Sequence, residues 1–191
     1  MLTGVGHADR GKLLSSMSTI ERVLAGGEKP PAEQVTLRPP EPGDMGWVVE
    51  RHGRIYAYEY GWNARFEALV AQIVADFVRE SDPERERCWI AEIDRRRVGC
   101  VFLVRKTLRE ARLRLLLDER DARGSGIGST LVNECIAFAR AAGYRTMTLW
   151  TNDVLTSARR IYEARGFQLV SEEAHSEYGP QLTGQTWELT L

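Results

Sequence analysis

The stretch "DARGSGIGSTL" at residues 121–131 combines three glycines and an arginine with the start of an apolar helical pattern. Backbone amides that curl into the positive end of a helix bind phosphate, and glycine permits the close approach and unusual dihedral angles that such a loop needs. An ordinary glycine-rich turn has the same composition. The loop alone therefore leaves both interpretations open.

Two common nucleotide-binding motifs do not match this loop. A P-loop requires G-x-x-x-x-G-K-[ST], and the stretch contains no lysine. The dinucleotide fingerprint G-x-G-x-x-G opens a strand–helix–strand unit and needs an acidic ribose ligand about 20 residues later. The actual spacing is R-x-x-G-x-G, from Arg123 through Gly126 to Gly128, and it follows several closely spaced strands. Both nucleotide hypotheses are therefore excluded.

A second motif follows the glycine loop, because residues 158–167 read A-x-x-x-Y-x-x-x-G-F with Tyr162 at the centre. In this order and spacing the two motifs resemble the GNAT family of acyl-CoA-dependent N-acetyltransferases, over residues 35–191. The resemblance implies an α/β fold with a mixed, mostly antiparallel sheet, splayed central strands and flanking helices. It also implies acetyl-CoA as co-substrate, no metal, and transfer of an acetyl group to the primary amine of a small molecule or a peptide amino terminus by direct attack.

The resemblance assigns most of the loop to acetyl-CoA. The loop amides are implied to wrap the pyrophosphate, with Gly126 and Gly128 giving the closest approach. One amide, of Leu116 or Leu117, is implied to hold the thioester carbonyl, where negative charge grows on attack. The implied cofactor site comprises Leu116, Leu117, Asp118, Arg123, Gly124, Ser125, Gly126, Ile127, Gly128, Ser129 and Asn152.

Tyr162 matches the family's tyrosine that protonates the departing CoA thiolate, although a tyrosine that only packs is the alternative. Two positions depart from the family pattern. Leu155 stands where many relatives have an asparagine, so Asn152 either substitutes for it against pantetheine or is an exposed turn residue. Relatives tend to carry an apolar residue and then a proline near Asp118 and Arg120, and Asp118 is either a base or an inert charge near a helix.

The acceptor side of the site is less defined. Glu59 and Glu110 are candidate bases, and loss of the proton to water would need neither. By resemblance, residues 54–63 and 172–184 wall the acceptor site. The aromatic side chains in these two segments are Tyr56, Tyr58, Tyr60, Trp62, His175 and Tyr178. They either enclose a cationic amine, which aromatic faces attract, or form a strand or a core patch.

The elements that must carry these residues follow from the hydrophobic pattern. Strands are expected at 35–40, 87–94, 97–105, 111–118, 144–151, 167–170 and 184–191. Helices are expected at 42–52, 64–80, 127–142 and 153–167. Short polar turns between the second, third and fourth strands predict an antiparallel meander. The helix between 111–118 and 144–151 predicts a crossover and hence a parallel pair.

Composition narrows the class of protein. Lysine and arginine number 26 against 27 acidic residues, so no overall charge favours nucleic acid. Cys88, Cys100 and Cys135 lack metal-ligand spacing and are expected to be reduced thiols of a cytoplasmic protein. The sequence contains no apolar run of about 18 residues and no signal-peptide pattern, so we expect neither membrane insertion nor export.

The chain is expected to divide into a helical appendage at 1–34 and the acetyltransferase domain at 35–191. Residues 9–27 carry an apolar stripe and resemble the last helix of MarR-type winged-helix regulators, which precede a GNAT domain in some bacterial proteins. That helix can dock on the domain, pair two copies into a dimer, or end a larger unit. No recognition helix precedes it, so DNA binding by this chain is not expected. An acyl-CoA-binding sensor with little turnover is the alternative function.

Overall fold

A computed structural model of the 191-residue chain describes Met17 and residues 35–191. The strands in this part are β1 (Thr36–Arg38), β2 (Arg87–Ile93), β3 (Arg96–Arg105), β4 (Glu110–Asp118), β5 (Thr146–Asn152), β6 (Gln168–His175) and β7 (Leu182–Thr190). The helices are α2 (Asp44–Tyr60), α3 (Ala64–Glu80), α4 (Ile127–Ala141) and α5 (Thr156–Ala164), with a 3-10 turn η1 (Arg120–Ala122) before α4. The predicted helix at 9–27 and its MarR resemblance lie outside the described residues.

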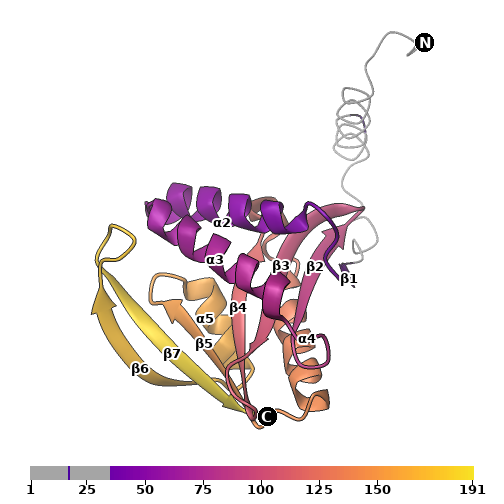
Figure 1. The fold of residues 1–191 in the computed structure, drawn as a ribbon. Helices are drawn as coiled ribbons and strands as arrows, with labels where there is room; N and C mark the ends of the chain where they lie inside the picture. The colour runs from indigo at the N-terminus through magenta and orange to yellow at the C-terminus, as the bar shows by residue number, and fades with distance from the viewer. Residues whose placement is uncertain (1–16, 18–34) are drawn as a thin grey trace, which may run out of the picture. The chain divides into compact units, whose positions relative to one another are not determined.

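The strands of residues 35–191 form one sheet in the order β1-β2-β3-β4-β5-β7-β6. Every neighbouring pair is antiparallel except β4 and β5, which are parallel and joined through α4. Helices α2 and α3 cover one face of the sheet, and α4 and α5 cover the other (Figure 1). The predicted mixed, mostly antiparallel sheet with flanking helices is confirmed, including the meander and the crossover.

The central strands part after a short paired segment. β4 pairs with β5 only from Glu110 to Leu113, although both strands continue well beyond that point. Just past Leu113, the pairing of β4 with β3 shifts register, and Leu115 takes a left-handed φ of 53°. A bulge of this kind bends and twists its strand. The predicted splay is therefore present, and it begins at the bulge.

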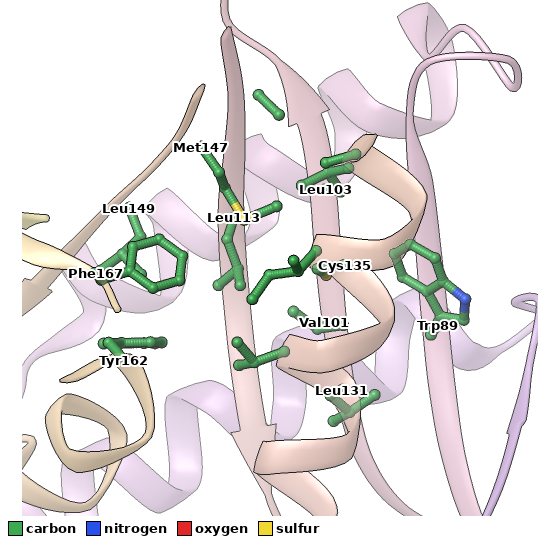
Figure 2. Close-up of a cluster of buried hydrophobic side chains, with 14 of the residues drawn as sticks. Trp89, Val101, Leu103, Leu113, Leu131, Cys135, Met147, Leu149, Tyr162 and Phe167 are labelled. Carbon is green, nitrogen blue, oxygen red and sulfur yellow. The ribbon is translucent and has the colours of Figure 1, made fainter. Parts of the chain in front are cut away.

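The core between the sheet and α4 is closely packed (Figure 2). Val101, Leu103, Leu131 and Cys135 are fully buried between strands and helix. Burial of each large apolar side chain contributes about 1.5–3 kcal/mol relative to exposure. This packing fixes α4, and with it the glycine loop that precedes the helix.

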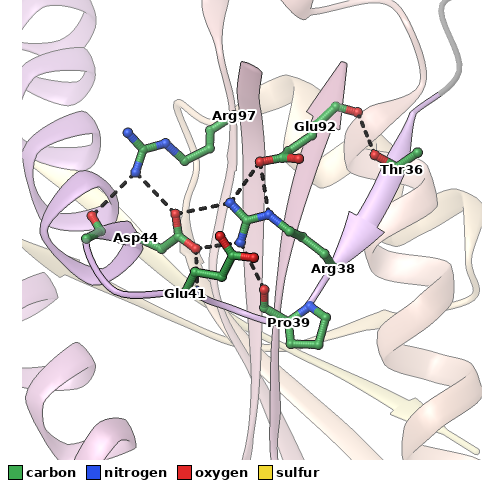
Figure 3. Close-up of polar contacts among 8 residues, drawn as sticks. Thr36, Arg38, Pro39, Glu41, Asp44, Glu92 and Arg97 are labelled. Carbon is green, nitrogen blue, oxygen red and sulfur yellow. Dashed lines mark hydrogen bonds and ion pairs between the residues drawn. The ribbon is translucent and has the colours of Figure 1, made fainter. Parts of the chain in front are cut away.

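A network of charged side chains holds the start of α2 (Figure 3). Asp44 is buried and accepts hydrogen bonds from Arg38 at 2.6 Å, Arg97 at 3.1 Å and the amide of Glu41 at 2.6 Å. Arg38 also donates to Glu92 at 2.9 Å, so the network joins α2 to three strands. Burial alone would raise the pKa of Asp44, but the hydrogen bonds from Arg38, the Glu41 amide and Arg97 outweigh it and lower the pKa.

Helix α2 extends beyond its predicted end at His52. Its buried residues include Val48, His52 and Ile55, which follow helical spacing. The polar ring of His52 interrupts the apolar pattern, and the tyrosines beyond it alternate as they would in a strand. The interpretation of these tyrosines as a strand is therefore wrong, since Tyr56 and Tyr60 lie one turn apart on a helix.

The end of the chain also differs from expectation. Strand β6 continues to His175 and pairs with β7, so the segment 172–184, expected as a loop, is mostly strand. The residues of β6 before His175 are all exposed because β6 is an edge strand, and its polar sequence gives no alternating pattern. Helix α5 begins at Thr156, three residues later than predicted.

Within residues 35–191 the helices are too short or too polar to cross a membrane. In the same part of the chain, no three His, Cys, Asp or Glu side chains gather where they could hold a metal ion. Cys88, Cys100 and Cys135 are buried thiols without a disulfide partner among the described residues. Burial raises the pKa of each thiol.

Replacing Asp44 by Asn should lower the free energy of unfolding by about 2 kcal/mol at pH 7, because two guanidinium groups lose their buried anion. The native pKa of Asp44 lies below its unfolded value. The ionised carboxylate therefore stabilises the fold above the unfolded pKa, and this contribution is lost as the pH falls through the native pKa. Urea unfolding should thus give the full difference at pH 7 and pH 5, and a shrinking one below about pH 4.

Glu50→Gln is the matched control, since Glu50 pairs with Arg54 on the exposed surface of the same helix. Its loss should change the free energy of unfolding by less than about 1 kcal/mol. Equal effects of the two substitutions would show that the Asp44 network does not anchor α2.

Candidate functional site

The glycine loop presents a row of unpaired amides in front of α4. Gly124 and Gly126 have φ values of 83° and 79°, a left-handed conformation that favours glycine. The amides of Arg123, Gly124, Gly126, Ile127 and Ser129 find no acceptor within residues 35–191. Since these donors lie at the positive end of the helix, the loop is suited to bind an anion.

Gly128 differs from its neighbours, because its amide donates to Asp118 Oδ2 at 3.1 Å. Asp118 thus caps α4 from the end of β4, and burial raises the pKa of its carboxyl. A Cβ atom on Gly128 would lie 2.8 Å from Asp118 Oδ2 and 2.8 Å from Ile161 Cδ1. A side chain at position 128 would therefore require the ends of the Asp118 and Ile161 side chains to move.

A cavity of about 390 Å³ opens beside this loop. All of the predicted cofactor-site residues except Ser125 and Asn152 line it. Helix α5 contributes Ser157 and Arg160 to the wall, and α2 contributes Tyr60. The structure thus brings together the end of β4, the glycine loop and the second motif, as the resemblance implied.

The bulge in β4 directs one amide into the gap between β4 and β5. The carbonyl of Leu115 accepts a hydrogen bond from Cys100 Sγ on β3 at 3.4 Å. The peptide that joins Leu115 to Leu116 is trans, so the amide of Leu116 points the opposite way. Because β5 has already separated from β4, this N–H faces the gap. Of the two amides predicted for this role, the geometry favours that of Leu116.

A second cavity, of about 110 Å³, adjoins the first and shares Tyr56, Leu116, Leu155 and Ala158 with it. Tyr162 lines this second cavity. Its ring is buried beside that of Phe167 (Figure 2). The two ring centroids are 5.8 Å apart. Burial raises the pKa of Tyr162, so its hydroxyl keeps its proton at neutral pH. The two motifs therefore meet at two connected cavities.

Asn152 lies at the end of β5 and also lines the second cavity. It is 1% exposed, and its Oδ1 lies 2.7 Å from His175 Nε2. The alternative of an exposed turn asparagine is therefore wrong. His175 in turn packs against Trp150 and Tyr178, of which Trp150 lines this cavity and Tyr178 lines a third one described below.

His52 is a buried polar group that the sequence did not single out. Its Nδ1 lies 2.8 Å from the carbonyl of Val48, so Nδ1 carries the proton and donates. Its Nε2 is buried without a partner among the described residues, and the ring lines the second cavity. Burial lowers the pKa of His52 to about 4, which leaves the imidazole neutral at pH 7. The cavity therefore contains an unused hydrogen-bond acceptor.

Three predicted residues lie elsewhere. Tyr58 is 75% exposed and stacks with Arg120, so it encloses no acceptor. Glu59 forms ion pairs with Arg120 at 3.0 Å and Arg123 at 2.8 Å, which tie the glycine loop to α2. Glu110 lies at the opposite end of β4. Neither glutamate lines the two cavities.

Comparison with known proteins places this geometry in a family. Residues 28–167 match the model of the acetyltransferase (GNAT) family. Human N-acetyltransferase 8B is 32% identical over 113 residues, which cover 56% of this chain and 50% of that protein. The Probable N-acetyltransferase camello of Xenopus laevis is 40% identical over 84 residues, 42% of this chain and 37% of that protein. The chain thus spans half or less of the length of these curated relatives.

The fold has close structural counterparts. The acetyltransferase yncA of Salmonella typhimurium, solved with its cofactor acetyl-CoA, superposes with a TM-score of 0.65. The match covers 82% of this chain and 94% of that chain at 17% sequence identity, a likeness that concerns the fold. The match to the family model covers most of the sequence, and the fold agrees with it. The chain belongs to the GNAT acetyltransferase family.

Proposed function

We propose that this chain is an acetyl-CoA-dependent N-acetyltransferase that acetylates the primary amine of a small molecule or a peptide amino terminus by direct attack. The observation that carries the proposal is the pair of connected cavities where β4 and β5 part. One cavity is faced by unpartnered amides at a helix start. The other is faced by a neutral histidine and a protonated tyrosine. The N-acetyltransferase names of the curated relatives support the same activity.

The residues of the first cavity fit acetyl-CoA. The unpartnered amides from Arg123 to Ser129 suit the pyrophosphate, and the positive end of α4 adds to the attraction. The unpaired edge of β4 suits the amide-rich pantetheine arm. When bound, the co-substrate supplies an activated acetyl thioester. The amide of Leu116 is oriented to donate to the thioester carbonyl oxygen, where negative charge develops on attack.

The residues of the second cavity can move the two protons that the reaction requires. His52 Nε2 accepts a hydrogen bond from the attacking amine, and it can take the proton that becomes acidic once nitrogen bonds to carbon. The hydroxyl of Tyr162 donates a proton to sulfur as the carbon–sulfur bond breaks. A proton then passes through solvent from the His52 imidazolium to the Tyr162 phenolate, which restores both side chains. The net result is transfer of one proton from the amine nitrogen to the thiol.

We also infer a cytoplasmic location, because Cys88, Cys100 and Cys135 are buried thiols without a disulfide partner among the described residues. Such thiols are typical of a reducing compartment. Dimerisation through the helix predicted at 9–27 stays a prediction.

Release of free thiol on mixing acetyl-CoA with a broad panel of amines tests the activity, with mass spectrometry of the acetylated product. A sensor that binds acyl-CoA without turnover would share the first cavity, so binding alone does not distinguish the two functions. If acetyl-CoA binds and no amine accelerates thiol release, the enzymatic function is contradicted.

Tyr162→Phe should lower kcat roughly 100-fold while the Kd for acetyl-CoA stays the same, because the leaving sulfur loses its proton donor. Tyr144→Phe is the matched control. The Tyr144 hydroxyl donates to the carbonyl of Arg85, away from both cavities. Its removal should leave kcat unchanged. Equal kcat in Tyr162→Phe and wild type would remove the assigned role.

His52→Phe should lower kcat/KM roughly 10- to 100-fold without changing acetyl-CoA affinity, since the amine loses its acceptor. The carbonyl of Val48 keeps its helical hydrogen bond, so the fold should persist. Because the pKa of His52 is about 4, the wild-type pH profile should have no limb near pH 6.5, where an ordinary histidine titrates. If kcat/KM of the wild type changed with pH near 6.5, and this change were absent in His52→Phe, the conclusion that His52 is neutral at pH 7 would be contradicted.

Gly128→Ala should raise the Kd for acetyl-CoA roughly tenfold, because its Cβ would push the start of α4 away from Asp118 and Ile161. Gly143→Ala is the control, since Gly143 lies just beyond the other end of α4 and a Cβ there meets nothing within 4 Å. With φ of 77°, Gly143→Ala should cost about 1 kcal/mol of stability and leave the Kd unchanged. Equal Kd values for the two variants, measured by calorimetry, would show that close packing at Gly128 does not shape the loop.

A further inference from the structure

Two arginines line the acceptor side of the site. Arg112 and Arg114 are two residues apart on β4, so their side chains leave the same face of the sheet. Both line the second cavity and also a third, of about 270 Å³, that adjoins it. Glu177 lies in the wall of the third cavity, but neither arginine forms an ion pair within 4.0 Å in the described part of the chain.

The unpaired state of these guanidinium groups is costly for the fold. Arg114 is half-buried, and burial together with the neighbouring Arg112 lowers its pKa. Other partly buried arginines contact carboxylates: Arg38 contacts Asp44, and Arg51 contacts Glu119. Two adjacent like charges without such a partner repel each other, and a bound anion would relieve that repulsion.

The phosphates of the co-substrate do not account for this pair. Arg123 and Arg160 line the first cavity beside the glycine loop, and neither Arg112 nor Arg114 lines it. The bulge at Leu115 separates the two sets along β4. The positive charge of Arg112 and Arg114 therefore faces the amine acceptor.

The rest of the second cavity is lined by apolar side chains and by polar groups that include an unpartnered donor, Trp62 Nε1, as well as an acceptor. Phe66, Leu69 and Ile73 of α3 face the arginines, and His52 Nε2 is the unpartnered acceptor described above. A ligand that satisfies these walls has an anionic group, an apolar side chain and an N–H donor. The guanidinium fork matches a carboxylate in geometry as well as in charge.

We propose that Arg112 and Arg114 bind the carboxylate of the acceptor, and that the acceptor is a free amino acid with an apolar side chain. The inference rests on the proposed acetyl transfer, and it names the substrate class. The amine of such a substrate reaches His52 while its carboxylate lies at the two guanidinium groups. The first cavity stays available to the co-substrate.

The test compares kcat/KM for L-leucine and L-leucinamide, which differ only in the carboxylate. The amino group of L-leucinamide loses its proton more readily than that of L-leucine, so L-leucinamide is intrinsically the more reactive amine. A preference for L-leucine would therefore oppose this difference in reactivity. Wild-type protein should prefer L-leucine by roughly tenfold or more, as expected for a charge-assisted contact. In Arg112→Gln, Arg114→Gln and the double variant the ratio should fall toward one. Arg140→Gln, at an exposed position on α4, should keep the wild-type ratio.

Binding of N-acetyl-L-leucine and N-acetyl-L-leucinamide, measured by calorimetry with CoA present, gives a readout that needs no turnover. Carboxylate-dependent binding that both arginine variants lose would support the anion site even if no amine were acetylated, and only the proposed function would then fail. Equal use of L-leucine and L-leucinamide by the wild type would overturn the anion site and leave the transferase intact. Absence of both turnover and carboxylate binding would also overturn it.

Discussion

The separation of β4 from β5 is the constraint on which the rest of the site depends. Four residue pairs join these parallel strands, and beyond Leu113 of β4 and Leu149 of β5 the two strands no longer pair with each other. The bulge at Leu115 turns one peptide so that its carbonyl faces β3 and the following N–H faces the gap. Without this separation, β5 would cover the edge of β4, and the two cavities would be closed by sheet hydrogen bonds. Helices α2 and α4 matter because they border the gap from opposite faces.

Polar groups without partners gather at this gap. The loop amides, His52 Nε2, Trp62 Nε1 and the two guanidinium groups of β4 all lie in its walls. An unsatisfied buried donor or acceptor costs about 1–3 kcal/mol, so folding stability opposes His52 Nε2 and Trp62 Nε1, whereas most of the loop amides and the two guanidinium groups belong to residues that are exposed or only partly buried. Elsewhere, the buried Asp44 accepts from three donors. The contrast is the physical reason for treating the gap as a ligand site, because ligands can supply the partners that the described chain does not.

The sequence predicted the sheet, and it singled out the glycine loop and the end of β4, which line the first cavity, because those features depend on local patterns. Strand periodicity, glycine spacing and the tyrosine motif can all be identified in the amino-acid sequence. The acceptor side was predicted poorly.

Leu115 adopts a left-handed conformation, although the position holds no glycine that would have indicated it in the sequence. In the sequence, His52 is a polar residue that interrupts an apolar helical pattern. Its Nε2 is buried without a partner among the described residues, and this follows from tertiary packing, which the local pattern does not predict. Glu59 was a candidate base, but its carboxylate forms ion pairs with Arg120 and Arg123, which are distant in the sequence.

Amide hydrogen exchange measured by NMR, with and without acetyl-CoA, tests the central claim most directly. If the gap and the glycine loop hold the co-substrate, Gly124, Gly126, Ile127, Ser129 and Leu116 should become protected on binding. Gly128 should already be protected in the free protein, because its amide is bonded to Asp118. Exchange at Leu116 that acetyl-CoA leaves unchanged, or protection confined to residues away from β4 and the loop, would contradict this account of the site.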